Sequence, residues 1–498
     1  MRRIQVKFSE TRPKETGNIQ RLSETAQRWG KFLIVLCQNF IAFFVGKPGP
    51  YRLHFNLNWP FPRKLGKTSM RPLLPIFLLI LLGAGSCNTT GKPIVDIAFT
   101  DSLLSHYLPS PSEKLAAGDL DFWKKRLDSA PGAYTALLSV SGGLAQRFHL
   151  YGDMADLLAA DSILNRLNLE YKEKEAGILR SLASLNITRH RFKEADEFVQ
   201  KALAIGSEKY ASTLLYFDTQ FELGSYVLAE QALRSCAASN EYGYFFRLSK
   251  WKHLQGETDS AVFYMQKAAD WAGTSLVLKQ TALSNMADLY MHEGELKKAN
   301  DLYTANLKQN AADYHSLQGI GRIALMKDNN AVQAEKIFRF IAGKNKLPDA
   351  VYNLEWVAEQ KSDSVLQKQY AGDFVKRTSD TVYGGMYNKY LIELFTGILQ
   401  SPDKALSVAE KEINNRSTPQ TYAWLAWTLH KTGNDTKAWE VYKAHVSGKP
   451  LEALELYWMG KMMKDLGKNY NASEFFKAAN KNLYDLSPAK QRDLKSLL

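Results

Sequence analysis

The stretch Gly319-Ile320-Gly321-Arg322-Ile323-Ala324 matches GxGxxA, a pattern that can bind the pyrophosphate of a dinucleotide. That chemistry requires the pattern to join a β-strand to a helix. The preceding residues, 314–318, instead continue a helical pattern. Small residues that let two helices pack closely are therefore the better interpretation of this stretch.

Other residues whose side chains could take part in catalysis or metal binding are scattered along the sequence. The sequence contains no phosphate-binding GxxxxGK[ST], no nucleophile elbow GxSxG and no zinc-binding HExxH. The nine histidines show no ligand spacing with a carboxylate nearby. Cys236 falls on the apolar face of a predicted helix, where a single thiol is most often a small core residue. We expect a non-enzymatic protein without a metal site or a cofactor.

Cys87 is the one residue for which we predict a covalent modification. It ends the run LLPIFLLILLGAGSC, which follows Met70-Arg71-Pro72 and has an apolar core of about 11 residues. This pattern resembles the signal peptide of bacterial lipoproteins, over residues 70–87. A single transmembrane helix is the alternative, but it needs roughly 20 apolar residues.

The resemblance implies that Cys87 becomes the first mature residue and carries lipid, such as palmitate, in the membrane. Because such signals stand at the N-terminus, we interpret residues 1–69 as a mis-annotated, disordered extension. Asn88 follows the cysteine, without the acidic residues of inner-membrane retention or surface export. We therefore expect an outer-membrane lipoprotein on the periplasmic face, with the cell surface as the other possibility.

The charge distribution argues against a nucleic-acid partner. The whole chain carries +13 at pH 7, but residues 1–69 hold 13 basic and 3 acidic residues, a net of +10. Residues 70–498 therefore carry only 13 − 10 = +3. A nucleic-acid-binding domain normally keeps its excess positive charge in the folded part.

Residues 418–450 predict two antiparallel helices joined by a short turn. Thr418 is a capping residue, and Pro419 occupies the first helical position, where a missing N–H costs little. Gly433 breaks the first helix, and Pro450 stops the second. The apolar residues of each helix recur at helical spacing on one face, as in Tyr422, Leu425, Ala426 and Leu429, then Ala438, Val441, Tyr442 and His445.

Small residues repeat at the same position along most of the chain. The spacings are 34, 32, 38 and 35 residues in the first series and 33 and 34 in the second. The first series is Ala195, Ala229, Ala261, Ala299 and Ala334, and the second is Ala405, Ala438 and Ala472. This pattern resembles tetratricopeptide (TPR) repeats, specifically those of Bacteroidetes-like TPR lipoproteins.

The resemblance implies an all-α fold, a right-handed superhelical α-solenoid of about ten TPR-like helix pairs. The pairs should span residues 116–486, after a tether or linker at residues 88–115. Residues 487–498 should form a C-terminal capping helix.

By the same resemblance, the first helices of the pairs should line a concave groove that binds a partner. Ordinary solvated or packed positions are the alternative for each residue. The groove candidates are Phe246, Lys250, His253, Asp288, Met291, His292, Trp427, His430, Tyr457 and Lys461.

We expect a lipid-anchored TPR scaffold that binds partner proteins or peptides in the bacterial cell envelope. The lipid bilayer, through the acylated Cys87, is the second expected partner, with no nucleic acid and no small-molecule cofactor. The alternative is an outer-membrane lipoprotein that captures glycans or nutrients with TPR-like helices. Such proteins carry long irregular insertions, and this sequence has only a loop at residues 379–386.

Overall fold

The computed structural model describes residues 92–498 with the exception of residue 380. The predictions for residues 1–69, for the signal peptide at residues 70–87 and for Cys87 lie outside the described residues. Between residues 92 and 498, no helix has both the length and the apolar character that crossing a bilayer requires.

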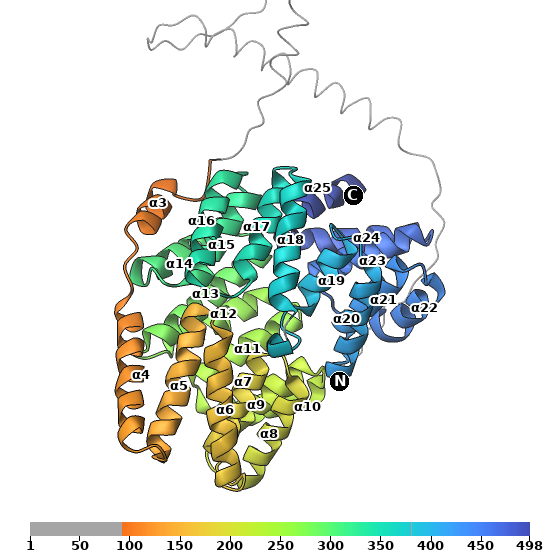
Figure 1. Cartoon of the computed structure of the whole chain (residues 1–498). Coiled ribbons are helices and arrows are strands. Elements are labelled where there is room, and N and C mark those ends of the chain that lie inside the picture. The colour runs from red at the N-terminus through yellow and green to blue at the C-terminus, as the bar shows by residue number, and fades with distance from the viewer. Residues whose placement is uncertain (1–91, 380) are drawn as a thin grey trace, which may run out of the picture. The chain divides into compact units, whose positions relative to one another are not determined.

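Helical hairpins stacked in sequence order make up most of the described chain (Figure 1). Ten such pairs follow one another, and the two helices of each pair pack against each other, while most pairs also pack against the next one. The predicted all-α solenoid of about ten TPR-like helix pairs is confirmed. The pairs are α5 (Tyr134–Tyr151) with α6 (Met154–Glu170), α7 (Ala176–Thr188) with α8 (Phe192–Ile205), α9 (Lys209–Glu222) with α10 (Tyr226–Ser235), α11 (Tyr242–Leu254) with α12 (Thr258–Asp270), α13 (Leu276–His292) with α14 (Leu296–Gln309), α15 (Tyr314–Met326) with α16 (Ala331–Lys344), α17 (Asp349–Gln360) with α18 (Ser364–Thr378), α19 (Asn388–Thr396) with α20 (Pro402–Asn415), α21 (Pro419–Lys431) with α22 (Asp435–Val441), and α23 (Ala453–Asp465) with α24 (Asn469–Lys481).

Local sequence signals determine where these helices begin and end. The Thr418 hydroxyl accepts a hydrogen bond from the Thr421 N–H at 3.2 Å, and the Thr418 N–H donates to the Thr421 hydroxyl at 3.0 Å. This reciprocal pair satisfies two of the free donors at the start of α21. Gly433 has φ of 82° in the turn that follows, a conformation that favours glycine.

Small residues lie where the helices cross. A Cβ atom at Gly319 would lie 2.4 Å from the Tyr303 ring, and one at Gly321 would lie 2.6 Å from the Phe338 ring. Only glycine allows these aromatic rings to approach so closely. The structure thus confirms that the GxGxxA stretch serves helix packing, inside the single helix α15.

Helix α3 (Ile97–Ser105) lies within the range for which the sequence predicts a tether, residues 88–115. The Asp96 side chain caps this helix by accepting from the Phe99 N–H. The N–H groups of Ile94 and Val95 donate to the Asp328 carboxylate at 2.9 and 2.8 Å. Helix α4 (Pro111–Ser129) also begins in this range. Residues 94–105 are therefore structured, because a cap and a distant carboxylate hold them against α16.

Helix α25 (Pro488–Leu497) occupies the predicted C-terminal position and packs against both α24 and α17. The Ala489 N–H donates to the Glu359 carboxylate at 2.9 Å. A carboxylate at a helix N-terminus is favoured by the free N–H groups there. The last helix therefore joins the inner side of a repeat that lies more than 100 residues earlier (|i−j| = 130).

The solenoid closes on itself along a contact zone that we call the seam. Here the turns that follow α7, α9, α11 and α13 meet the loops that precede α21 and α23 and follow α24. The Asn415 side chain donates to the His190 carbonyl at 2.9 Å, and the Asn482 side chain donates to the His292 carbonyl at 3.0 Å. These contacts join residues 225 and 190 positions apart.

Arg416 is the central side chain of the seam. Its guanidinium lies 2.6 Å from Glu412 and 3.1 Å from Glu222, and only 11% of the side chain is exposed. It also lies over the rings of Phe192 and Trp424. One cation thus joins helices from both sides of the seam.

The substitution Arg416→Met should destabilise the protein by roughly 3 kcal/mol, because it leaves Glu412 buried without its cation. Urea unfolding of the purified full-length chain measures this loss. Lys411→Met, at an exposed position of α20, the helix that Arg416 follows directly, should change stability by less than about 0.5 kcal/mol. Equal stability of the two variants would contradict the central place of Arg416.

Candidate functional site

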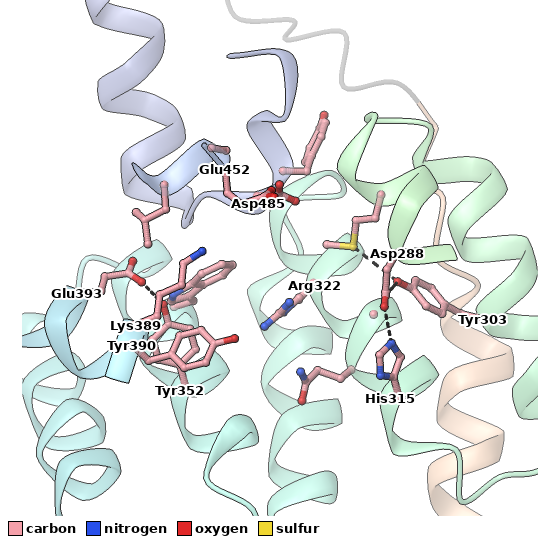
Figure 2. Close-up of a pocket in the computed structure, with 17 residues that line it drawn as sticks. Asp288, Tyr303, His315, Arg322, Tyr352, Lys389, Tyr390, Glu393, Glu452 and Asp485 are labelled. Carbon is pink, nitrogen blue, oxygen red and sulfur yellow. Dashed lines mark hydrogen bonds and ion pairs between the residues drawn. The ribbon is translucent and has the colours of Figure 1, made fainter. Parts of the chain in front are cut away.

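A concave pocket of about 270 Å³ opens on the inner side of the solenoid (Figure 2). The first helices of four successive pairs, α13, α15, α17 and α19, form most of its wall. The start of α23 and the short helix η5 (Leu483–Asp485) close it from the other side of the seam. This central pocket is lined by Asp288, Met291, Tyr303, His315, Gln318, Gly319, Arg322, Tyr352, Trp356, Lys389, Tyr390, Glu393, Glu452, Ala453, Leu454, Tyr484 and Asp485.

One register position supplies a pocket residue from each of the four helices. Asp288, Arg322, Trp356 and Tyr390 are spaced by 34 residues at every step. Residues one repeat apart occupy equivalent places on adjacent first helices. A row of one acid, one base and two aromatic rings therefore runs across the wall of the pocket.

Arg322 points into the space between Tyr390 and Asp288 (Figure 2). Its Nε donates to the Asn353 side chain at 2.9 Å, and its guanidinium carbon lies 5.4 Å from the centre of the Trp356 ring. Among residues 92–498, its two terminal nitrogens meet no hydrogen-bond acceptor. A guanidinium held in this way presents its two terminal nitrogens to a planar anion.

Asp288, by contrast, is already partnered. Its carboxylate accepts a hydrogen bond from the Tyr303 hydroxyl at 2.5 Å and lies 2.8 Å from Nε2 of His315. Burial alone would lower the pKa of His315, but the charge and the hydrogen bond of Asp288 raise it to about 9. His315 is therefore a cation at pH 7, and its charge offsets that of Asp288.

Lys389 contributes a second cation to the pocket wall. Its ammonium lies 3.3 Å from the carboxylate of Glu455, a fully buried residue that also accepts a hydrogen bond from the Trp424 indole at 2.7 Å. Burial acts to lower the pKa of Lys389, but the charge of Glu455 outweighs it and raises the pKa above its ordinary value. Lys389 therefore stays charged beside Arg322, although its charge is shared with Glu455.

The wall behind the pocket contains a cluster of buried carboxyl groups against which α25 docks. Glu393 accepts a hydrogen bond from the Tyr352 hydroxyl and lies 2.6 Å from the ammonium of Lys490. Glu355, in the same cluster, accepts from the Gln367 side chain at 2.7 Å. Burial raises the pKa of Glu355 to about 8, and the charge of Glu359 adds to the shift.

The high pKa of Glu355 predicts a loss of stability as the pH rises. Between the ordinary value of 4.5 and about 8, the folded protein keeps a proton that the unfolded chain releases. The free energy of unfolding should therefore fall with pH in this window, by up to about 1.4 kcal/mol per unit from this group. Glu355→Gln, which still accepts from Gln367, should reduce that slope.

Urea unfolding at several pH values between 5 and 8 tests this prediction. Glu410→Gln serves as the control, because Glu410 is exposed on α20. An unchanged slope in the Glu355 variant would show that the carboxyl group is ionised in the folded state.

A second, larger cavity adjoins the central pocket. It has a volume of about 900 Å³ and shares His315 and Gln318 with the central pocket. Helices α5, α13 and α15, the loop at residues 345–348 and the start of α17 form most of its walls. We call it the side cavity, and His315 and Gln318 form a wall that it has in common with the central pocket.

The structure places only part of the predicted groove set in the central pocket. Asp288 and Met291 line it. Phe246 instead stacks on Tyr242, with ring centres 5.7 Å apart, and packs in the core of α11–α13.

Lys250 and His253 lie at the seam. Lys250 is 3.5 Å from Glu222, and the His253 ring meets the ring of His292 with centres 4.8 Å apart. Burial would raise the pKa of Glu222, but the charges of Lys250 and Arg416 hold it below its ordinary value. These residues therefore join two parts of the same chain.

Tyr457 and Lys461 contact the C-terminal helix. The Tyr457 hydroxyl donates to Asp493 at 2.6 Å, and the Lys461 ammonium lies 3.3 Å from the same oxygen. Helix α25 thus occupies this part of the concave surface.

Trp427 and His430 lie on α21, in the repeat that precedes α23. Trp427 is buried and stacks on Trp458, with ring centres 5.8 Å apart. His430 lies between Asp435 and Asp465, at 2.7 and 3.1 Å. Partner binding by the ten groove candidates stays a prediction.

The sequence analysis missed the pocket residues of α15, α17 and α19. The small-residue series is interrupted between Ala334 and Ala405, and this interruption covers α17 and α19. The signal that would have found them is the 34-residue step from Asp288 to Arg322, Trp356 and Tyr390.

No protein-family model matches this chain, and no curated protein matches its sequence. Many solved structures are similar to it, and three of them illustrate the likeness. A tetratricopeptide repeat protein from Parabacteroides merdae has 15% identity and a TM-score of 0.31, over 51% of this chain and 98% of that chain. The APC/C hetero-tetramer Cut9–Hcn1 has 16% identity and a TM-score of 0.43, over 77% of this chain and 69% of that chain. The IFIT1 monomeric mutant with Gppp-AAAA has 12% identity and a TM-score of 0.41, over 65% of this chain and 75% of that chain. At these identities the similarity concerns the fold alone.

Proposed function

We propose that this chain is a binding protein that holds an extended segment of a partner protein, with an acidic group of that segment at Arg322. The observation that supports this most directly is the guanidinium of Arg322. It faces the central pocket, is fixed by Asn353 and Trp356, and its terminal nitrogens meet no acceptor among the described residues. A carboxylate that binds both nitrogens forms a bidentate, charge-assisted pair.

The sizes of the cavities and their adjacent position favour a peptide over a compact small molecule. The central pocket, at about 270 Å³, is smaller than a typical small-molecule site and suits one or two side chains. The side cavity of about 900 Å³ begins at His315 and Gln318 and accommodates the continuing chain. Lys389 adds positive charge near Arg322.

Several tryptophan rings already have a cation or another ring against one face, which weighs against the alternative of glycan capture. A sugar ring that stacks on an aromatic side chain needs an open face. Arg322 lies over Trp356, Trp427 stacks on Trp458, and the ammonium of Lys468 lies 4.2 Å from the centre of Trp439. One face of Trp356 and of Trp439 is thus covered in a cation–π pair, and one face of Trp427 is covered by another ring.

Selection from a random peptide library with the purified full-length chain should enrich peptides that contain a conserved acidic position. Arg322→Gln should weaken binding of a selected peptide by about 10- to 100-fold, as for loss of a hydrogen bond to a charged group. The affinity of Arg322→Lys should lie between that of the unchanged chain and that of Arg322→Gln, because lysine keeps the positive charge but cannot form the bidentate pair. Fluorescence anisotropy with labelled peptide measures these affinities.

Arg234→Gln is the matched control, because Arg234 is an exposed cation of α10 that does not line the pocket. Its affinity should equal that of the unchanged chain. Enriched peptides without an acidic position, or equal binding by the Arg322 variants, would contradict the proposed site. Binding on a glycan array in the absence of any peptide binding would support glycan capture instead.

We further propose that the chain is anchored by lipid on Cys87 at the periplasmic face of the outer membrane, where its partners are envelope proteins or peptides. The signal-like pattern at residues 70–87 supports this address. The intact mass of the protein from its own host should correspond to a chain that starts at an acylated Cys87. A soluble chain that retains residues 1–69 would refute the anchor and leave the Arg322 proposal to its own test.

A further inference from the structure

A second group of convergent side chains lies at the seam. His292 ends α13, Glu452 stands immediately before α23, and Asp485 ends η5. One donor atom from each lies within 4.8 Å of the other two, and Nδ1 of His292 is 2.6 Å from the Asp485 carboxylate. We propose that these three side chains bind a divalent transition-metal ion, with Zn²⁺ as the best match.

The donor set points to this class of ion. An imidazole nitrogen and two carboxylate oxygens are ordinary ligands of Zn²⁺, whereas Ca²⁺ and Mg²⁺ prefer oxygen ligands alone. The two carboxylates carry a charge of opposite sign and equal size to that of a divalent ion. Ligation by His292 requires its neutral imidazole, with Nδ1 free to accept the metal.

The positions need only a small adjustment to reach metal geometry. Metal–ligand distances of about 2.0–2.2 Å place adjacent donors of a tetrahedral site about 3.4 Å apart. The largest donor separation here is 4.8 Å. Rotation of the two carboxylates supplies the difference, because both are partly exposed and the Glu452 side chain makes no hydrogen bond or ion pair with residues 92–498.

Two contacts hold the end of α13 against η5, and so His292 near Asp485, independently of any ion. The Asn482 side chain donates to the His292 carbonyl at 3.0 Å, and Gly294 lies against the Tyr484 ring. Donors that are already assembled cost less ordering on binding.

The site is also open to an entering ion. Glu452 and Asp485 line the central pocket, while His253, His292 and Glu452 line a cavity of about 580 Å³ on the other side. A bound ion would cross-link the end of α13 to η5, between residues 193 positions apart. It would therefore strengthen the seam itself.

His430 provides an internal comparison. It too lies beside two carboxylates, but its Nδ1 faces Asp435 and its Nε2 faces Asp465. The two ring nitrogens point in different directions, so these donors do not converge on one point. We expect no metal at His430.

Calorimetric titration of ZnCl₂ into the full-length chain, without a histidine tag and after treatment with a chelator, tests the proposal. We expect one ion per chain with a micromolar or tighter dissociation constant. Glu452→Gln and Asp485→Asn should each weaken binding at least tenfold, and Asp485→Asn still offers an oxygen to His292. His430→Gln should leave the affinity unchanged.

Thermal unfolding gives a second readout. At free Zn²⁺ of 100 times the dissociation constant, the unfolding equilibrium constant of the unchanged chain should fall about a hundredfold, with no such change for Mg²⁺. Absence of Zn²⁺ binding below about 100 µM would overturn the proposal. So would equal affinity of the unchanged chain and the Glu452 variant, whose side chain makes no hydrogen bond or ion pair with the described residues.

Discussion

Closure of the solenoid at the seam is the constraint on which the rest of the structure depends. A stack of helical hairpins normally meets only its neighbours, so its inner surface stays open. Here Arg416 fills the space between Glu412 and Glu222 and brings two distant parts of the stack into contact. The seam also completes the wall of the central pocket, because Glu452 and Asp485 line the pocket from the far side of the seam.

Pairing of charges then determines which groups of the pocket remain available. Asp288 is engaged by His315, and Lys389 by Glu455. Arg322 has an amide and a ring as neighbours, and neither neutralises its charge. The inner surface is therefore rich in charge, yet it offers a ligand one strong anion-binding group with a defined orientation.

The fold was predictable from sequence because its signals are local. The cap at Thr418, the turn at Gly433 and the spacing of small residues each act within one repeat of about 34 positions. Helix α3 escaped prediction because its place depends on Asp328, more than 200 residues away (|i−j| = 233). The pocket row was readable in principle, since Asp288, Arg322 and Trp356 keep the repeat spacing. The seam could not be predicted from the sequence, because no local pattern indicates that His292 contacts Asp485. Helical periodicity likewise does not separate a groove residue from a core residue such as Trp427.

Contacts across the seam also change how such a chain folds and unfolds. In an open repeat array, stability is close to a sum over neighbours, and the array can fray from its ends. In this chain α3 is held by α16 and α25 by α17, so neither end of the described solenoid is held by its neighbours alone. Contacts between residues about 190 to 230 positions apart raise the contact order, which slows folding. The closed solenoid therefore behaves less like a chain of independent modules and more like one cooperative domain.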